Sequence, residues 1–528
     1  MSPQTIEWLT PEIVLILGAT AVYLAGCFTV RRARLHWAAA IVILAAAGAL
    51  AQQPLSPTTS HSGPLVIDAF AQSMRWLGLG VGLVFLLISA RSADPRLAPE
   101  FAGSLVLIVA GLCLLASAAD LVLIFLALEL VSIPTYVVLY LGRADRQAQE
   151  AATKYFFLSI LSSAVLLYGF SFLYGATGST SLRAIAVALP EPPAPLAPLA
   201  PLALVLVFAG LGFRLTAVPF HFYAPDVYQG TSHPNAGLLA VVPKIAGLVA
   251  LVRLAFGAMS SSELERVGWQ LSLVLAVLTM TVGNLLALAQ QNVRRLLAYS
   301  SIAHAGYMLI GLAVGFAAGG GQTGHGPDGV AATLFYLVVY ALATAGIFAA
   351  LAFVSGGRRV DTLDDLAGLA QRRPTVAAAL AVCLFSLAGL PPLAGFWGKF
   401  TLLIGAIGLY SPGDAAGTPG PWFLALAIVG AVNAAIAATY YLRMIGTMYF
   451  RPASTDNAAE LQTAGPAPAV AMGLCTLLVI FAGLASGPLL SRAETITRAA
   501  RAAFASTTAP VGTASTNAKL AQSPTPNP

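Results

Sequence analysis

Charged residues are scarce in this sequence. Only 9% of its 528 residues are Asp, Glu, Lys or Arg, whereas 58% are hydrophobic, and the mean hydropathy is +0.83. Because soluble domains carry about 25% charged residues, the composition excludes an ordinary soluble protein. Apolar runs of about 20 residues, the length of a helix that crosses a bilayer, recur about fourteen times. The alternating pattern of membrane strands is missing, so we expect an all-α integral membrane protein with about 14 transmembrane helices.

Motifs that bind cofactors are also missing. The cysteines occur singly in apolar runs, without a CxxC pair or a nearby histidine: Cys27, Cys113, Cys383 and Cys475. This spacing offers no ligand set for zinc, haem or an iron–sulfur cluster, and no P-loop pattern offers a nucleotide site. We therefore expect no cofactor, no metal and no nucleic-acid partner for this chain. Any redox chemistry that it serves would take place in another subunit.

The basic residues are distributed unevenly among the loops. Most of the 27 Lys and Arg residues fall in alternate loops, which begin with Arg31, Arg32 and Arg34, whereas the loops between them hold only Arg75, Arg183, Arg253 and Arg266. Four more follow the last span: Arg492, Arg498, Arg501 and Lys519. Since cytoplasmic loops are rich in Lys and Arg, the pattern predicts that both termini lie outside the cytoplasm. We expect a multi-pass protein of a bacterial inner membrane.

Two apolar runs contain prolines far from their ends. Pro219 and Pro225 lie in RLTAVPFHFYAPDVYQG, and Pro391 and Pro392 lie in LAGLPPLAGFWGKF. Proline removes a backbone donor and kinks a helix, and the freed carbonyls must then face protein or a hydrated cavity. We therefore expect broken helices near residues 211–225 and 386–400. His221 and Asp226, which flank the first of them, are candidate helix caps.

The two broken helices indicate two inverted repeats of about five helices each, an arrangement common in transporters. The chain then divides into an N-terminal three-helix segment (1–100), a first repeat (101–257), a second repeat (268–450), a C-terminal helix (467–490) and a disordered tail rich in Ser, Thr, Ala and Pro (503–528).

Five ionisable residues lie deep within different predicted spans: Glu129, Arg214, Lys244, His304 and Lys399. A charge at the bilayer centre costs at least about 2.5 to 3.5 kcal/mol, so such groups usually face one another or water. We expect them to form a polar axis through the bundle. Glu129 is the one acidic residue that we place well inside a span, and it cannot neutralise three deep cations. A proton relay is therefore favoured over a purely structural pairing of Glu129 with Arg214 or Lys244.

Several motifs resemble the NADH-quinone oxidoreductase subunit N family, the antiporter-like membrane subunits of respiratory complex I. They are LELVSIPTYV, KYFFLSILSSAVLLYGFSFLYGATGS, PFHFYAPDVYQG, NVRRLLAYSSIAHAGYMLIGL and LAGLPPLAGFWGKF, and the resemblance covers nearly all of residues 1–490. It implies that Glu129 matches the carboxylate of the fifth helix, Lys244 the central lysine of the eighth, and Lys399 the terminal lysine of the broken twelfth. Arg214 stands where the seventh helix usually has a lysine. A guanidinium does not lose its proton in proteins, so we expect Arg214 to act as an electrostatic modulator of Glu129.

The resemblance also implies partners and cofactors outside this chain. The partners would be other membrane subunits of the complex, especially the antiporter-like subunit M and the small subunit K, while NADH, FMN, Fe–S clusters and quinone would be bound elsewhere in it. Two alternatives stay open. One is a subunit of a multisubunit Na⁺/H⁺ antiporter, and the other is a scaffold that conducts no protons, an idea that the arginine at position 214 supports.

Overall fold

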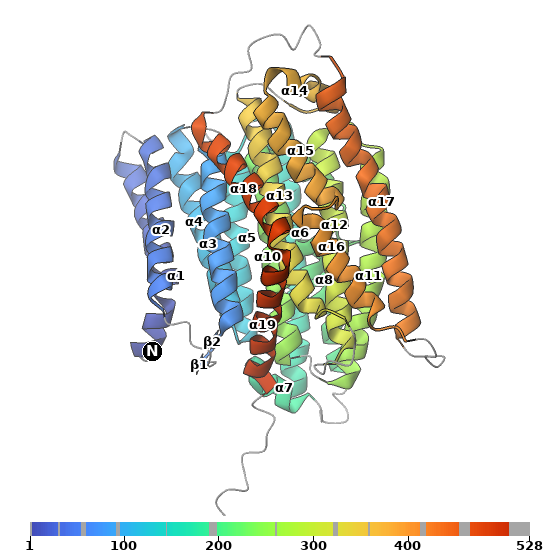
Figure 1. Ribbon diagram of the computed structural model, residues 1–528. Helices are drawn as coiled ribbons and strands as arrows, with labels where there is room; N and C mark the ends of the chain where they lie inside the picture. Colours follow the sequence, from blue (N-terminus) through green and yellow to red (C-terminus); the bar gives the residue numbers. More distant parts are fainter. Residues whose placement is uncertain are drawn as a thin grey trace, which may run out of the picture.

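The computed structural model is a bundle of long helices (Figure 1). The structure describes residues 3–29, 32–53, 60–90, 95–143, 145–189, 198–258, 261–319, 326–356, 360–411, 419–452 and 465–505. The α-helices are α1 (Pro3–Phe28), α2 (Leu35–Gln52), α3 (Ala69–Ser89), α4 (Ala98–Ala116), α5 (Leu121–Leu141), α6 (Arg146–Thr177), α7 (Leu182–Ala188), α8 (Leu199–Leu215), α9 (Ala224–Gly230), α10 (His233–Ala258), α11 (Ser262–Leu288), α12 (Val293–Ala317), α13 (Gly329–Ser355), α14 (Leu369–Arg372), α15 (Pro374–Ala388), α16 (Ala394–Ile407), α17 (Gly420–Phe450), α18 (Pro466–Leu484) and α19 (Ser486–Ala505). A small antiparallel hairpin joins β1 (Ser60–Ser62) to β2 (Leu65–Ile67).

Within the described ranges, 12 helices are long and apolar enough to cross a membrane. They are α1 to α6, α10 to α13, α17 and α18. Two further crossings are interrupted, because α8 is followed by the short α9, and α15 is followed by α16. The twelve long helices and these two broken ones confirm the expected all-α membrane fold with about 14 spans.

The breaks follow from local backbone conformation near the prolines. After α8, Thr216 has a φ of 58°, and after α15, Gly389 has a φ of 90°, so each helix ends in a left-handed residue. Pro219, Pro391 and Pro392 lie in the connections that follow. Pro225 does not break a helix, because it lies in the first turn of α9, where its missing N–H would have no partner anyway.

The helix α15 and the helix α16 approach each other closely at the second break. A Cβ atom added to Gly395 would lie 1.7 Å from the backbone oxygen of Ser386, so no larger residue fits there. The Gly395 N–H donates to Ser386 Oγ at 3.1 Å. This contact fixes the start of α16, and thereby the position of Lys399.

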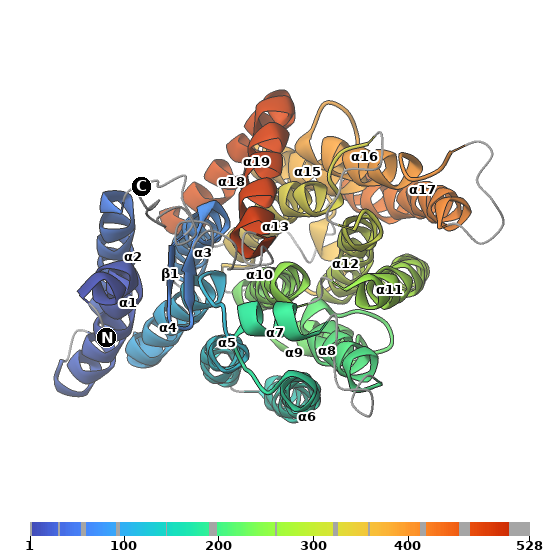
Figure 2. The same cartoon turned by 90° about the horizontal axis from the view of Figure 1, so that it is seen from below.

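The middle of the bundle is formed by α10, α12 and α13 (Figure 2), while α1 and α2 lie at one side and α11 and α17 at another. All of the apolar stretch of α12 and 94% of that of α10 are buried within the protein. By contrast, only 33% of the apolar stretch of α1 is buried. Lys244 on α10 and His304 on α12 therefore lie where neither lipid nor bulk water reaches them.

Two buried ion pairs hold the N-terminal helices. Glu12 of α1 lies 2.8 Å from Arg75 of α3, and Asp68, the N-cap of α3, receives two hydrogen bonds from Arg253 of α10 at 2.7 and 2.9 Å. The sequence-based placement of Arg75 and Arg253 in loops is wrong, because both are buried within helices. The expectation that Glu129 alone lies deep in a span is also wrong, since Glu12 lies within α1 and is 2% exposed. The error arose because the sequence does not show that a charged residue has a partner, so a paired charge inside a helix cannot be told from a charge in a loop.

The bundle has two ends, which we call the α14 end and the α7 end after the short helices found there (Figure 1). The first residues of α1 and the last turn of α19 both lie at the α7 end. The sequence-based boundary at residue 490 falls inside α19, which extends to Ala505. Residues 506–528, most of the predicted tail, lie outside the described residues. The domain boundaries stay a prediction.

Candidate functional site

The buried Arg214 and the partly exposed Glu129 form the first polar cluster. Arg214 Nη2 donates to Glu129 Oε1 at 3.2 Å, and Ser163 Oγ donates to the same oxygen at 2.5 Å. The other arm of the guanidinium, Nη1, donates to Ser132 Oγ at 2.5 Å and to the Leu128 carbonyl at 3.4 Å. The cluster therefore joins α5, α6 and α8, and the fork of the guanidinium is occupied on both sides.

Lys244 lies at the centre of α10 and is completely buried. Its Nζ donates to Ser301 Oγ at 2.6 Å and to Thr216 Oγ1 at 3.1 Å. Both partners are neutral, and in the part of the chain that the structure describes Lys244 has no carboxylate partner. Thr216 is the left-handed residue that ends α8, so the first broken helix supplies one of the two oxygens that hold the ammonium group.

Ser301 connects Lys244 to a group of buried tyrosines. Its Oγ lies 2.8 Å from the Tyr340 hydroxyl and 3.3 Å from the Tyr228 hydroxyl. A serine hydroxyl can donate one hydrogen bond and accept two, so it can receive a proton on one side and give one up on the other. Ser301 is thus a junction between α10, α12, α13 and α9.

His304 lies one turn beyond Ser301 on α12, inside a cage of tyrosine rings. Its Nδ1 lies 2.5 Å from the Tyr336 hydroxyl, and its Nε2 lies 2.8 Å from the Tyr441 hydroxyl. The ring centroid of Tyr340 is 5.2 Å from that of His304, and the centroid of Tyr307 is 6.2 Å away. Both imidazole nitrogens therefore have partners that can donate or accept, whichever tautomer is present.

Lys399 lies in the second turn of α16, next to the second break. Its Nζ donates to the backbone oxygens of Leu387 at 2.8 Å and Ala388 at 3.1 Å, which belong to the last turn of α15. The end of a helix carries unpaired carbonyls and a partial negative charge, which favours a nearby cation. The ammonium also lies 4.9 Å from the ring centroid of Tyr307. The double proline thus exposes carbonyls that the lysine contacts.

The five ionisable residues predicted from sequence come from α5, α8, α10, α12 and α16. The structure brings Glu129 and Arg214 into direct contact, and it joins Lys244 to the helix of His304 through Ser301. Tyrosine rings lie between the remaining groups. Sequence reasoning missed the hydroxyl groups that make these links, on Ser163, Thr216, Ser301, Tyr336, Tyr340 and Tyr441. One signal was present, because Ser301 precedes His304 by three residues in SSIAHAGY and so shares its helix face.

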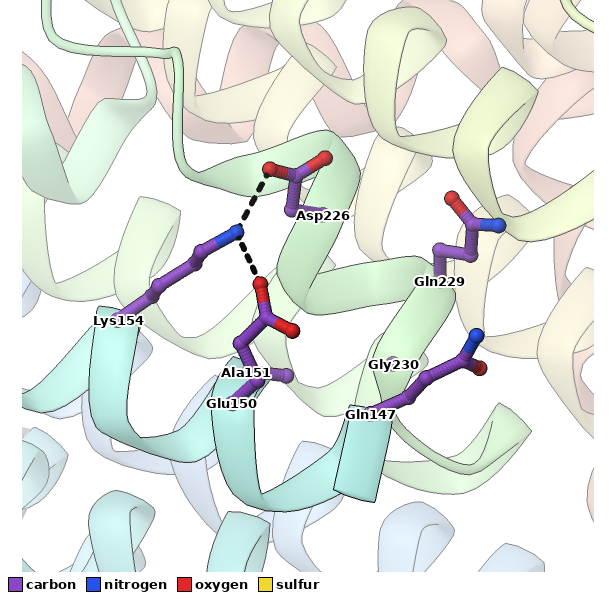
Figure 3. Close-up of a pocket in the computed structure, with 7 residues that line it drawn as sticks. All are labelled: Gln147, Glu150, Ala151, Lys154, Asp226, Gln229 and Gly230. Carbon is purple, nitrogen blue, oxygen red and sulfur yellow. Dashed lines mark hydrogen bonds and ion pairs between the residues drawn. The ribbon is translucent and has the colours of Figure 1, made fainter. Parts of the chain in front are cut away.

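A polar pocket opens beside α9, near the N-terminal ends of α6 and α12. It has a volume of about 240 Å³, and Figure 3 shows Gln147, Glu150 and Lys154 of α6 facing Asp226 and Gln229 of α9. The prediction that Asp226 caps a helix is wrong, because α9 starts without a side-chain cap. The carboxylate instead binds Lys154 at 3.2 Å and Arg295 of α12 at 2.6 Å.

Asp226 thus has two charge-assisted contacts, one with Arg295 and one with Lys154. It ties α9, and with it Tyr228, between α6 and α12.

The comparisons with known proteins agree with this architecture. The profile of a family described as NADH:quinone oxidoreductase/Mrp antiporter, transmembrane, matches residues 118–412, which include all five ionisable residues. A chain of the Mrp complex from Dietzia sp. DQ12-45-1b has the same fold, with a TM-score of 0.76 and 21% identity over 95% of this chain and 99% of its own. The fold and the matched region thus define an antiporter-like membrane protein.

Closer relatives narrow the class. A NADH-quinone oxidoreductase subunit N from Anaeromyxobacter sp. (strain Fw109-5) is 37% identical over 84% of this chain and 87% of its own length. A chain of respiratory complex I from Thermus thermophilus, solved with bound aureothin, is 31% identical, covers 91% of this chain and 98% of its own, and has a TM-score of 0.73. The chain belongs to the NADH-quinone oxidoreductase subunit N family.

No group of three or more His, Cys, Asp and Glu side chains that could hold a metal ion occurs among the described residues.

Proposed function

We propose that this chain is a proton-translocating membrane subunit of an NADH:quinone oxidoreductase. In this proposal protons move along an axis of Glu129, Lys244, His304 and Lys399, and electron transfer from NADH to quinone in other subunits supplies the energy. The observation that supports it best is the surroundings of Lys244 and Lys399. Each buried ammonium group is held by neutral oxygens alone among the described residues, whereas a structural cation is normally buried against an anion.

The hydroxyl groups between the lysines suggest how protons would move. Lys244 can give its proton to Ser301, which already accepts a hydrogen bond from it, and Tyr340 continues the chain toward His304. His304 can then exchange protons through Tyr336, and Lys399 lies against the ring of the neighbouring Tyr307. Water would have to complete the steps at which no hydrogen bond joins these groups. Each proton that leaves the cell works against about 2.3 kcal/mol per 100 mV.

Arg214 has a different part in this proposal. Its guanidinium contacts Glu129 but keeps its proton, so it tunes the carboxylate and carries nothing itself. We further propose the partners that the family implies, the membrane subunits of the complex and especially subunits M and K. The orientation, with the α7 end and both termini outside the cytoplasm, rests on the distribution of Lys and Arg. The lipid environment would be a bacterial inner membrane.

Substitutions at Lys399 test the proposal in the purified complex, reconstituted into proteoliposomes. Lys399→Met removes both charge and proton, and it should lower NADH-driven proton uptake while the complex still assembles. Lys399→Arg keeps the charge but cannot release a proton. Pumping at the wild-type level in the Arg variant would show that Lys399 is a fixed charge that caps α15, and the relay would have to end elsewhere, with His304 as the next candidate.

The two alternatives make different demands. A Na⁺/H⁺ antiporter subunit should exchange Na⁺ for H⁺ in vesicles that contain this chain. Because a chain of the Mrp complex has the same fold, the fold does not distinguish the two functions, and the vesicle experiment decides between them. A scaffold should tolerate Lys244→Met and Lys399→Met together with no loss of pumping. We favour the relay because a scaffold gains nothing from two buried ammonium groups without anions.

A further inference from the structure

The last helix, α19, brings a cation to the second half of the bundle. Arg501 Nη1 lies 2.7 Å from Asp328 Oδ2, and the Asp328 side chain is only 5% exposed. Asp328 also caps α13, because it accepts hydrogen bonds from the backbone N–H groups of Val330 and Ala331. On its other side the guanidinium lies 5.3 Å from the ring centroid of Phe256, near the end of α10. Arg501 therefore joins α19, α13 and α10 at the α7 end.

A small pocket lies next to this ion pair. Its volume is about 30 Å³, which is enough to admit water, and both Arg501 and Asp328 line it together with Gly405 of α16. Gly405 follows Lys399 by six residues, which is about 9 Å along the helix. Val314 and Ala318 of α12 complete an apolar side of the pocket. The pocket thus lies beyond Lys399 along α16, in the direction of the α7 end.

A guanidinium at such a position opposes the passage of protons, because it is a permanent positive charge that repels them. The Asp328 side chain is 5% exposed, whereas that of Arg501 is 18% exposed. The guanidinium can therefore turn toward water when it leaves Asp328. An ion pair with one buried member and one partly exposed member suits a contact that opens and closes.

We propose that the Arg501–Asp328 pair closes the route between Lys399 and the aqueous phase at the α7 end, and that it must separate for a proton to pass there. This inference rests on the proposed function, because it takes Lys399 to be a proton carrier. Arg501 is a positioning residue in this scheme, and α19 is the helix that presents it.

The test measures passive proton leak through the whole complex in proteoliposomes, without NADH and under an imposed pH gradient. Arg501→Gln should raise the leak by roughly tenfold, which corresponds to the loss of about 1.4 kcal/mol of stabilisation of the closed state. Asp328→Asn should act in the same direction, and because Asn also caps helices well, α13 should stay intact. Arg498→Gln is the matched control, since Arg498 lies one turn away on α19 and its side chain is 64% exposed. It should leave the leak unchanged.

A double variant separates this proposal from the proposed function. Lys399→Met combined with Arg501→Gln should return the leak to the wild-type value, because the opened route then lacks its carrier. A wild-type leak in both Arg501→Gln and Asp328→Asn, with pumping still sensitive to Lys399→Met, overturns the gate and leaves the relay standing. A raised leak that Lys399→Met does not suppress also overturns the proposal, because the opened route then does not lead to Lys399.

Discussion

Ser301 offers the sharpest test of how the buried lysine works. Its hydroxyl is the nearest acceptor of Lys244, at 2.6 Å, and also the contact to Tyr340. A hydrogen bond to a charged group contributes about 1.5 to 3 kcal/mol, so Ser301→Ala should lower the rate of a proton transfer through this position by about ten- to a hundredfold. The Thr216 hydroxyl stays in place, so the ammonium keeps one partner and the fold should survive. The measurement is NADH-driven proton uptake by the reconstituted complex, together with the quinone reductase rate.

Two matched variants make the result specific. Ser300→Ala removes the neighbouring hydroxyl, which contacts Tyr441 instead of Lys244, and it should have a much smaller effect. Ser301→Thr restores a hydroxyl and should recover most of the pumping. If Ser301→Ala pumps like wild type, or if Ser300→Ala is equally damaged, then the path does not run from Lys244 through Ser301 and our assignment of the junction is wrong.

Three further predictions concern Glu129 and Arg214 in the first polar cluster and Asp226 beside the polar pocket at α9. Glu129→Gln should lower proton pumping and the coupled quinone reductase rate while the complex still assembles, and Glu129→Asp should do less harm because it keeps a carboxylate; wild-type rates in the Gln variant would remove Glu129 from the path. Arg214→Lys should retain pumping and Arg214→Ala should lose part of it, so a dead Lys variant would mean that the fork of the guanidinium is needed. Asp226 holds both Arg295 and Lys154 through charge-assisted contacts, so Asp226→Asn should lower the thermal stability of the complex, and an unchanged melting temperature would contradict this role.

The fold could be predicted largely from sequence, because hydropathy and proline position act over single segments. Apolar runs give the spans whatever their neighbours are, and Pro391 and Pro392 break a helix by their own chemistry. The ion pairs that hold the N-terminal helices could not be predicted, because they depend on which helices pack together. Asp68 and Arg253 are 185 positions apart, and nothing local to either residue shows that they meet. The helix α19 was missed for a related reason, since its polar composition resembles that of a tail until its buried face packs against α13 and α10.

The candidate site was predictable to a similar degree. Lys244, Lys399 and Glu129 stand out because a charge within an apolar run is rare and costly. The hydroxyl groups around them do not stand out, since serine, threonine and tyrosine are common in membrane helices and usually bond to their own backbone. Ser132 illustrates the difficulty, because it donates to the Leu128 carbonyl four residues earlier and also receives Arg214. Only the contact with Arg214, which reaches it from α8, distinguishes it from an ordinary helix serine.

Two cations on one helix provide a direct comparison between a structural charge and a functional one. Lys244 and Arg253 lie nine residues apart on α10 and are both completely buried. Arg253 holds Asp68 through two hydrogen bonds, whereas Lys244 is held by two hydroxyl groups. Removing one member of a buried ion pair leaves the other charge uncompensated and costs about 3 to 5 kcal/mol, whereas removing an unpaired buried charge relieves a desolvation cost.

The two substitutions should therefore have opposite consequences. Arg253→Met should lower the thermal stability of the complex or prevent its assembly. Adding Asp68→Asn should recover part of the loss, because this second change removes the stranded carboxylate charge while Asn keeps the cap of α3. Lys244→Met should assemble with a thermal stability at or above that of wild type and yet fail to pump protons. Thermal denaturation of the purified complex and proton uptake in proteoliposomes measure the two properties separately. If Lys244→Met were as unstable as Arg253→Met, the lysine would be part of the framework of the bundle, and the case for a proton carrier at its centre would fail.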